Sequence, residues 1–288
     1  MSDQVQPTVI AASAAPTGPA SLPDAQLFVS RPATRVVAVI AEKGGVGKTT
    51  TAVNLAAAFV EADDECLLID MDAQGGGATG ALGVRTPPAE QSVLAVLLEQ
   101  APLSNTIMRT DSGIDLVPSN FGLTGLAFMA DLAREMRLRS ALSQFVGTPD
   151  CPYTYIFIDC PPRLDVFSVN ALVAADLVVI PFVPEPLPEL TLGDVFKAIR
   201  QVRLLRAGQG TLEVRGFIPN RVNRRREALT RDVLNRLPPG IPVLTTIHDS
   251  GYISRAPQSG KTVFQVAPNS LAADEYRRLR QELARDIA

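Results

Sequence analysis

The chain has 288 residues, of which 46% are hydrophobic and 20% charged, and its formal net charge is −3. Such a chain can bury one substantial core, which excludes wholesale disorder. A membrane-spanning helix is not expected, because even the most apolar stretch, residues 171–183, is interrupted by Asp176. The three cysteines lack metal-ligand spacing, and the single histidine, His248, makes a histidine-based catalytic triad improbable.

Residues 1–35 are rich in Ala, Pro, Ser and Thr, and their prolines interrupt any helical pattern. We predict a flexible tail, either a plain solvated extension or the carrier of a short partner motif. No positive charge precedes Arg31 and no long apolar run follows, so a secretory signal is not expected. Together with the odd number of cysteines, this predicts a cytoplasmic protein.

A phosphate-binding loop is predicted directly after the apolar run 36–40, which has the length of a buried strand. A helical pattern begins just beyond the loop. Glycines let the backbone turn its N–H groups toward one anion, and the helix N-terminus adds positive charge there. We expect Lys48 to reach the β- and γ-phosphates and Thr49 to ligate Mg²⁺. The residues of this loop are Lys43, Gly44, Gly45, Val46, Gly47, Lys48, Thr49 and Thr50.

Apolar runs of strand length alternate with helix-like stretches throughout residues 36–288. This alternation predicts an α/β fold in one domain, a doubly wound, mostly parallel sheet with helices on both faces. After the first run, the predicted strands are Cys66–Ile69, Ile114–Val117, Tyr155–Ile158, Leu177–Ile180, Val214–Ile218 and Val243–Thr246. The predicted helices include Gln91–Glu99, Leu123–Phe145, Leu190–Leu205 and Glu227–Leu237.

Polar side chains follow several of these strands, at the edge of the sheet where α/β proteins bind ligands. Asp70 and Asp72 end one run, and alternation lets both project the same way; they could hold Mg²⁺ and orient water, or simply cap the strand. Asp159 ends another run and predicts a Walker B acid near Mg²⁺ and Thr49. Asn220 can donate to and accept from an adenine edge, but is equally compatible with a turn.

Basic residues are concentrated between Asp194 and Arg236, where eleven Lys and Arg face four Asp and Glu. Such asymmetry on an acidic chain indicates a surface for a polyanion, although solvated helix faces would give the same composition.

Four segments together resemble the ParA family of partition ATPases: residues 43–56, 67–83, 155–181 and 256–283. The loop pattern K-G-G-x-G-K-[ST] resembles the deviant Walker A motif of the ParA/MinD group, since Glu42 replaces the first glycine of the general pattern. The resemblance spans nearly everything after residue 35.

The resemblance implies a Mg²⁺-dependent ATPase that forms an ATP-sandwich homodimer. Lys43 matches the signature lysine that reaches the partner subunit's phosphates, and Lys48 and Thr49 match the P-loop lysine and the metal ligand. Asp72 matches the residue that positions water. Asp70 and Asp159 match the acids around Mg²⁺, and Asn220, with Arg221 beside it, falls where the family contacts adenine.

The resemblance also implies a cycle in which the dimer binds DNA without sequence preference and a ParB-like partner stimulates hydrolysis, which places the protein on the nucleoid. The family's usually basic loop carries Asp249 and Tyr252 here. DNA binding must then rely on Arg224, Arg225, Arg226 and Arg231, or be weaker or absent. No helix-turn-helix precedes the ATPase, so sequence-specific operator binding is not expected.

Other cargo and other classes stay open. A ParA-like protein can position a protein cluster instead of plasmid or chromosomal DNA. A MinD-like membrane ATPase would need an amphipathic anchor, and the apolar stripe of the last predicted helix more often docks onto its own domain. An iron-protein-like reductase would need bridging cysteines, which Cys151 and Cys160 do not provide.

Overall fold

A computed structural model of the chain describes residues 34–72, 77–120, 122, 133–185, 189–207 and 210–285. All of these residues belong to one unit. The predicted tail over residues 1–35 lies outside the described residues except for its last two positions, and so do residues 123–132 of the predicted helix 123–145.

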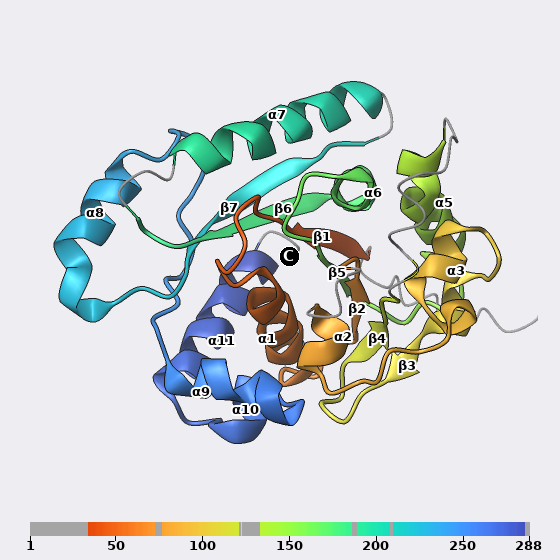
Figure 1. Cartoon of the computed structure of the whole chain (residues 1–288), viewed down its shortest axis with the longest axis horizontal. Coiled ribbons are helices and arrows are strands. Elements are labelled where there is room, and N and C mark those ends of the chain that lie inside the picture. The colour runs from red at the N-terminus through yellow and green to blue at the C-terminus, as the bar shows by residue number, and fades with distance from the viewer. Residues whose placement is uncertain are drawn as a thin grey trace, which may run out of the picture. The chain divides into compact units, whose positions relative to one another are not determined.

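The described residues are built on a seven-stranded sheet in the order β3-β4-β2-β5-β1-β6-β7 (Figure 1). Every neighbouring pair is parallel except β3 and β4. The predicted doubly wound, mostly parallel sheet is therefore confirmed. The strands are β1 (Arg35–Val39), β2 (Cys66–Asp70), β3 (Met108–Arg109), β4 (Asp115–Val117), β5 (Tyr155–Asp159), β6 (Leu177–Phe182) and β7 (Glu213–Pro219).

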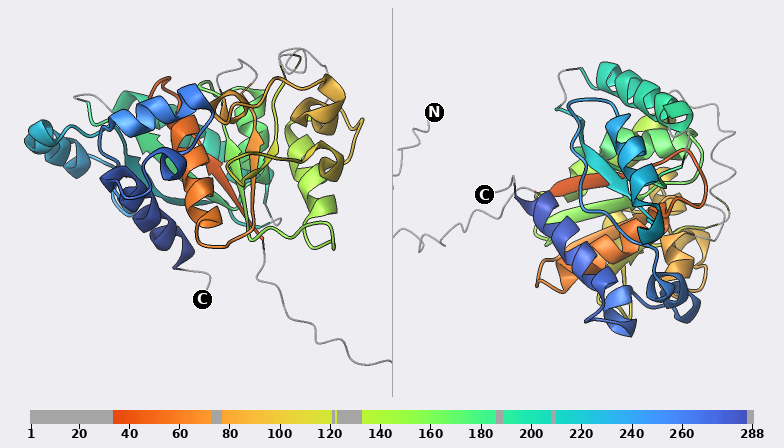
Figure 2. Two further views of the ribbon diagram at one scale, coloured as in Figure 1. Left: turned by 90° about the horizontal axis from the view of Figure 1, so that it is seen from below. Right: turned by 90° about the vertical axis from the view of Figure 1, so that its left-hand side faces the viewer.

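Helices cover both faces of this sheet (Figures 1 and 2). Successive side chains of a strand point to opposite faces, so Val36 and Ala38 join one apolar core and Val37 and Val39 the other. Helices α3, α5, α6 and α7 contribute to the first core, and α1 and α11 to the second. Because both faces are covered, the central strands read as continuous apolar runs.

Short polar residues begin several of the helices. The Asp165 carboxylate accepts hydrogen bonds from the first backbone N–H groups of α6, and the Ser270 hydroxyl does the same for α11. The helices are α1 (Lys48–Val60), α2 (Ala78–Ala81), α3 (Val93–Leu97), α5 (Arg137–Phe145), α6 (Val166–Ala174), α7 (Glu189–Leu205), α8 (Glu227–Asn235), α9 (Gly251–Arg255), α10 (Val263–Val266) and α11 (Leu271–Ala284).

Three sequence predictions differ from the structure. The predicted strand Val243–Thr246 is wrong: it makes only an isolated bridge between Val243 and Phe217, because neither Pro242 before it nor Pro219 on β7 has an N–H to extend the ladder. The predicted helix Gln91–Glu99 shortens to α3. The described part of the predicted helix 123–145 begins with a 3₁₀ turn, Arg134–Met136, before α5. The sequence also gave no sign of the two-residue strand β3.

Helix α11 docks onto the domain through its apolar stripe, beside α1 in Figure 1. Tyr276, Leu279 and Leu283 are each at most 1% exposed, and Arg277 pairs with Glu61 at the end of α1 with an Nη2–Oε1 distance of 2.6 Å. The expectation that this stripe packs internally therefore fits the described residues. None of the described helices combines the length and the apolar character that crossing a bilayer requires.

We predict that Leu279→Ala lowers the free energy of unfolding by about 2–5 kcal/mol, because the missing side chain leaves a cavity between α11 and the sheet. The measurement is urea denaturation followed by circular dichroism. Leu271→Ala is the matched control on the same helix, since Leu271 is 40% exposed and should change the free energy by less than about 1 kcal/mol. Equal losses in both variants would contradict the docking of α11.

Candidate functional site

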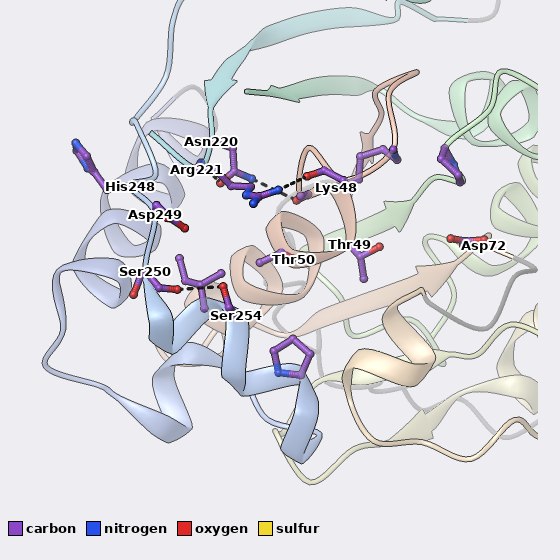
Figure 3. A pocket seen from close by; sticks show the side chains of 16 residues that line it. Lys48, Thr49, Thr50, Asp72, Asn220, Arg221, His248, Asp249, Ser250 and Ser254 are labelled. Carbon is purple, nitrogen blue, oxygen red and sulfur yellow. Dashed lines mark hydrogen bonds between the residues drawn. The ribbon is translucent and has the colours of Figure 1, made fainter. Parts of the chain in front are cut away.

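A cavity of about 410 Å³ opens at the carboxyl ends of the central strands (Figure 3). Its walls come from the loop between β1 and α1, the ends of β2, β5 and β7, and the segment that contains α9. In the sheet, β1 lies next to β5. The chain leaves β1 toward α1 on one face and leaves β5 toward α6 on the other face. Open α/β sheets bind ligands at the point where neighbouring connections diverge in this way. The lining residues are Gly44, Gly45, Gly47, Lys48, Thr49, Thr50, Asp72, Pro162, Asn220, Arg221, His248, Asp249, Ser250, Ile253, Ser254 and Pro257.

The backbone of the β1–α1 loop is shaped for an anion. Gly47 precedes α1 with φ 91°, and Gly45 has φ 75°, both in the left-handed region that favours glycine. A Cβ on Gly47 would also collide with the side-chain amide of Asn220. The first N–H groups of α1 have no partners within the helix and face this loop, so backbone donors and the helix dipole act at one point.

Lys48 extends beneath this loop and is only 6% exposed. Its amine donates a hydrogen bond to the Lys43 carbonyl oxygen at 3.0 Å. Burial lowers the pKa of Lys48, while the negative charges of Asp159 and Asp72 oppose that shift. A buried ammonium with one carbonyl partner is suited to receive an anionic oxygen, and Thr49 and Thr50 line the cavity next to it.

Asp70 and Asp159 occupy paired positions on the adjacent strands β2 and β5, and both are fully buried. Burial raises the pKa of Asp159 well above its ordinary value, and the charge of Asp70 raises it further, while the nearby Thr49 hydroxyl opposes the rise. Neither Asp159 oxygen makes a hydrogen bond of ordinary geometry in the described part of the chain. A buried carboxylate without partners is costly, so this position fits a cation beside Thr49.

Asp70 holds the chain around it through its two oxygens. The Thr79 N–H and hydroxyl donate to Oδ2 at 2.7 and 2.6 Å, and the Asp72 N–H donates to Oδ1 at 2.9 Å. Gly77 lies so close that a Cβ there would overlap the Asp70 carboxylate. Asp70 thus fixes the backbone of Asp72, whose side chain lines the cavity.

Asn220 and Arg221 follow β7 and close the cavity on the side opposite Asp72 (Figure 3). The Asn220 amide nitrogen donates to the Val46 carbonyl at 3.0 Å and to the Thr51 hydroxyl at 3.3 Å. Its oxygen accepts the Arg221 N–H at 2.9 Å and keeps one lone pair for another donor. The Arg221 guanidinium donates to the Gly45 carbonyl at 3.1 Å.

Lys43 is the predicted loop residue whose amine points elsewhere. It forms an ion pair with Glu185, beyond the end of β6, and borders a different hollow. Val46 takes part through its backbone, since its side chain is buried. The structure therefore brings Lys48, Thr49, Asp72 and Asp159 together within one chain, but not Lys43.

Sequence reasoning missed the wall formed by His248, Asp249, Ser250, Ile253 and Ser254. The His248 ring Nδ1 lies 2.6 Å from Oε1 of the buried Glu275 on α11, and the other oxygen of Glu275 accepts the His248 N–H. The sequence signal for this wall is the polar run just before Ala256-Pro257, for which the resemblance implies only a loop that contacts DNA.

Two of the four predicted polyanion residues, Arg224 and Arg225, lie beside this wall. Arg224, Arg225 and Arg226 form an exposed 3₁₀ turn, and Arg231 is exposed on α8. Arg224 and Arg225 border a second hollow of about 440 Å³ together with Tyr252. Both hollows are lined by His248, Asp249 and Ser250. The segment 248–250 therefore lies between the loop cavity and the surface that carries Arg224 and Arg225 (the arginine surface).

The family model described as AAA domain matches residues 34–208. The chain is 34% identical over 257 residues to the chromosome partitioning protein ParA of Caulobacter vibrioides, covering 86% of this chain and 93% of that protein. It is 32% identical over 267 residues to the sporulation initiation inhibitor protein Soj of Bacillus subtilis, covering 87% and 98%.

Two solved structures are also similar. Cobyrinic acid a,c-diamide synthase from Mycobacterium smegmatis, with bound ADP and magnesium, has a TM-score of 0.73 and 32% identity over 88% of this chain and 94% of its own. A putative plasmid partition protein from Borrelia burgdorferi, bound to AMPPNP, has a TM-score of 0.72 and 25% identity over 87% and 98%. The chain shares about a third of its residues with the ParA and Soj relatives over nearly their whole length, and its sheet carries the loop described above. The chain therefore belongs to the AAA-domain family and to the ParA family of partition ATPases.

Proposed function

We propose that the protein binds ATP with Mg²⁺, hydrolyses it to ADP and phosphate, and uses the ATP-bound homodimer to hold DNA without sequence preference. In this proposal a ParB-like partner stimulates hydrolysis, and the cycle segregates plasmid or chromosomal DNA on the nucleoid. The observation that carries it is the convergence of Lys48, Thr49 and Asp72 around one cavity, with the buried Asp159 carboxylate next to Thr49 and Lys48. The relatives named for partition point to the same process.

The triphosphate would lie on the N–H groups at the start of α1, with the Lys48 amine on its terminal phosphates. Thr49 and Asp159 would hold Mg²⁺, which neutralises charge on the phosphates when bound. The described residues offer no cluster of three His, Cys, Asp or Glu side chains suited to a metal, so phosphate and water oxygens would supply most of the ligands. Adenine would lie near Asn220 and Arg221, where the free lone pair of Asn220 can accept its amino group.

Asp72 would orient the attacking water, because its side chain lines the cavity and Asp70 fixes its backbone. Asp70 would also add negative charge beside Asp159, at the edge of the cation's surroundings. Lys43 would act in trans by placing a positive charge on the phosphates of the partner subunit, in the manner of an arginine finger.

Other functions find less support. The name of the Mycobacterium smegmatis structure refers to amide formation, but a glutamine-dependent route would need a reactive cysteine, and all three cysteines here are buried. A MinD-like membrane role would need a free amphipathic helix, whereas α11 buries its stripe in the domain. Positioning of a protein cluster remains compatible with the same site and is distinguished by the cargo.

We predict that Asp72→Ala retains ATP binding and loses about 10²–10⁴-fold in turnover, because the phosphate cradle is intact and the water is no longer oriented. Lys48→Ala should lose ATP binding itself. Binding is measured with a fluorescent ATP analogue and turnover by phosphate release. Asp111→Ala, which removes an exposed acid on the β3–β4 turn, is the control. Turnover of the Asp72 variant within threefold of this control would reject the assignment.

We predict that Arg224→Glu/Arg225→Glu/Arg226→Glu abolishes DNA retention in gel shifts at low salt, while ATP binding persists because the triplet lies outside the loop cavity. In the wild type, the logarithm of the affinity should fall with the logarithm of salt by about 0.9 for each phosphate contact. Arg85→Glu/Arg109→Glu/Arg278→Glu makes the same change in charge at exposed positions elsewhere. Equal retention of the two variants would show that only net charge matters.

A further inference from the structure

The Lys43 amine is held by its own chain. It pairs with the carboxylate of Glu185, which lies three residues beyond the end of β6 and 142 positions away in sequence. The two side chains are about equally exposed, 50% and 52%. They border a small hollow that Glu42, Phe182 and Leu192 also line, separate from the cavity that holds Lys48 and Asp72.

The backbone of Lys43 is fixed at the same time. Its carbonyl oxygen accepts the hydrogen bond from the buried Lys48 amine at 3.0 Å, so the loop cannot shift without disturbing the phosphate-binding lysine. The side chain of Lys43 is therefore the part that can move. Four rotatable bonds separate its amine from the backbone, and rotamer changes of half-exposed side chains are fast.

We propose that Glu185 is a positioning residue for Lys43: it holds the amine on the single chain, and two chains close around ATP only when this ion pair opens. The inference rests on the proposed function, because it concerns the action of Lys43 in trans. An amine bound to Glu185 cannot at the same time reach phosphates on another subunit. The pair and the dimer therefore compete for one positive charge on each chain, and the apparent association constant of the dimer is reduced by the square of the fraction of chains in which the pair is open.

The size of the effect follows from the exposure of the pair. Half-exposed ion pairs contribute little free energy, so the closed form exceeds the open form by a factor of only about two to five. An ion pair this weak opens readily when ATP binding favours the dimer, yet it still lowers the dimerisation of nucleotide-free chains. Salt should weaken the Lys43–Glu185 ion pair, because both charges are in contact with solvent.

The first experiment measures the amine in the nucleotide-free full chain. Glu185→Gln removes the negative charge that pairs with Lys43. Glu213→Gln, the control, removes a negative charge from the exposed start of β7. The chains are treated briefly with an acetylating ester, and peptide mass spectrometry gives the labelling of Lys43 relative to the exposed Lys261. We expect the ratio to rise about three- to sixfold in Glu185→Gln only. Glu185→Asp, which keeps the carboxylate, should recover at least part of the protection.

The second experiment measures dimerisation of the same variants by sedimentation velocity with Mg²⁺ and a non-hydrolysable ATP analogue. We expect the dissociation constant of the Glu185→Gln dimer to fall about ten- to thirtyfold relative to wild type and to Glu213→Gln, because the ion pair must open in both chains of the dimer. Faster labelling without tighter dimerisation would overturn the inference, and so would equal labelling in the two Gln variants. Wild-type chains that stay monomeric with the analogue would instead reject the dimer of the proposed function, and the labelling result would show separately whether the ion pair exists.

Discussion

The site depends on two carboxylates that the sheet forces together away from water. The pairing of β2 with β5 sets Asp70 opposite Asp159, and both are completely buried. Desolvation raises the pKa of each, which means that their ionised forms are destabilised at this position. The fold compensates Asp70 with hydrogen bonds from Thr79 and from the Asp72 backbone, but gives Asp159 only the nearby Thr49 hydroxyl and the more distant charge of Lys48. A cation at Asp159 would offset this imbalance, which is the physical reason for placing one there.

Close packing holds the remaining groups in register with these acids. Gly47 is required twice, by its positive φ and by the Asn220 side chain that lies against it. Gly77 is required because the Asp70 carboxylate occupies the space of its missing Cβ. Gly47 therefore lets the residue after β7 pack against the phosphate-binding loop. Gly77 lets the chain after β2 pack against the buried Asp70 carboxylate. The phosphate-binding loop therefore cannot shift at Gly47 without moving the Asn220 side chain.

Local sequence signals predicted the parts of this site that lie at strand ends. An apolar run followed by Asp, or by glycines and Lys, marks the carboxyl end of a buried strand, and a parallel sheet brings such ends to one edge. Lys48, Asp72 and Asp159 were therefore predicted together from the sequence. The strand predicted at Val243–Thr246 failed because β-branched content is also local, whereas strand pairing depends on which N–H groups find a partner.

Contacts between distant segments were not predictable in this way. Nothing near Glu185 indicates that its carboxylate meets Lys43, and nothing near His248 indicates that Glu275 holds it. These partners lie 142 and 27 positions apart, and each pairing depends on the folded positions of both residues, which no short sequence pattern encodes. No motif predicted the hydrogen bonds from Thr79 to Asp70 either.

The segment 248–254 gives the two proposed ligands a shared boundary. Its residues line the loop cavity on one side and, with Arg224 and Arg225, the second hollow on the other. Glu275 fixes the start of this segment through the His248 ring and backbone, so the segment is anchored to α11 rather than free to adapt to either ligand alone. If a nucleotide favours one position of the segment and a polyanion favours the same one, each increases the affinity for the other by an equal factor. A partition cycle requires this reciprocity, since DNA must be held with ATP and released after hydrolysis. In the proposed function, Asp249 and Tyr252 stand where the resemblance implies basic residues, so the segment would link the two surfaces while Arg224 and Arg225 beside it would carry the charge.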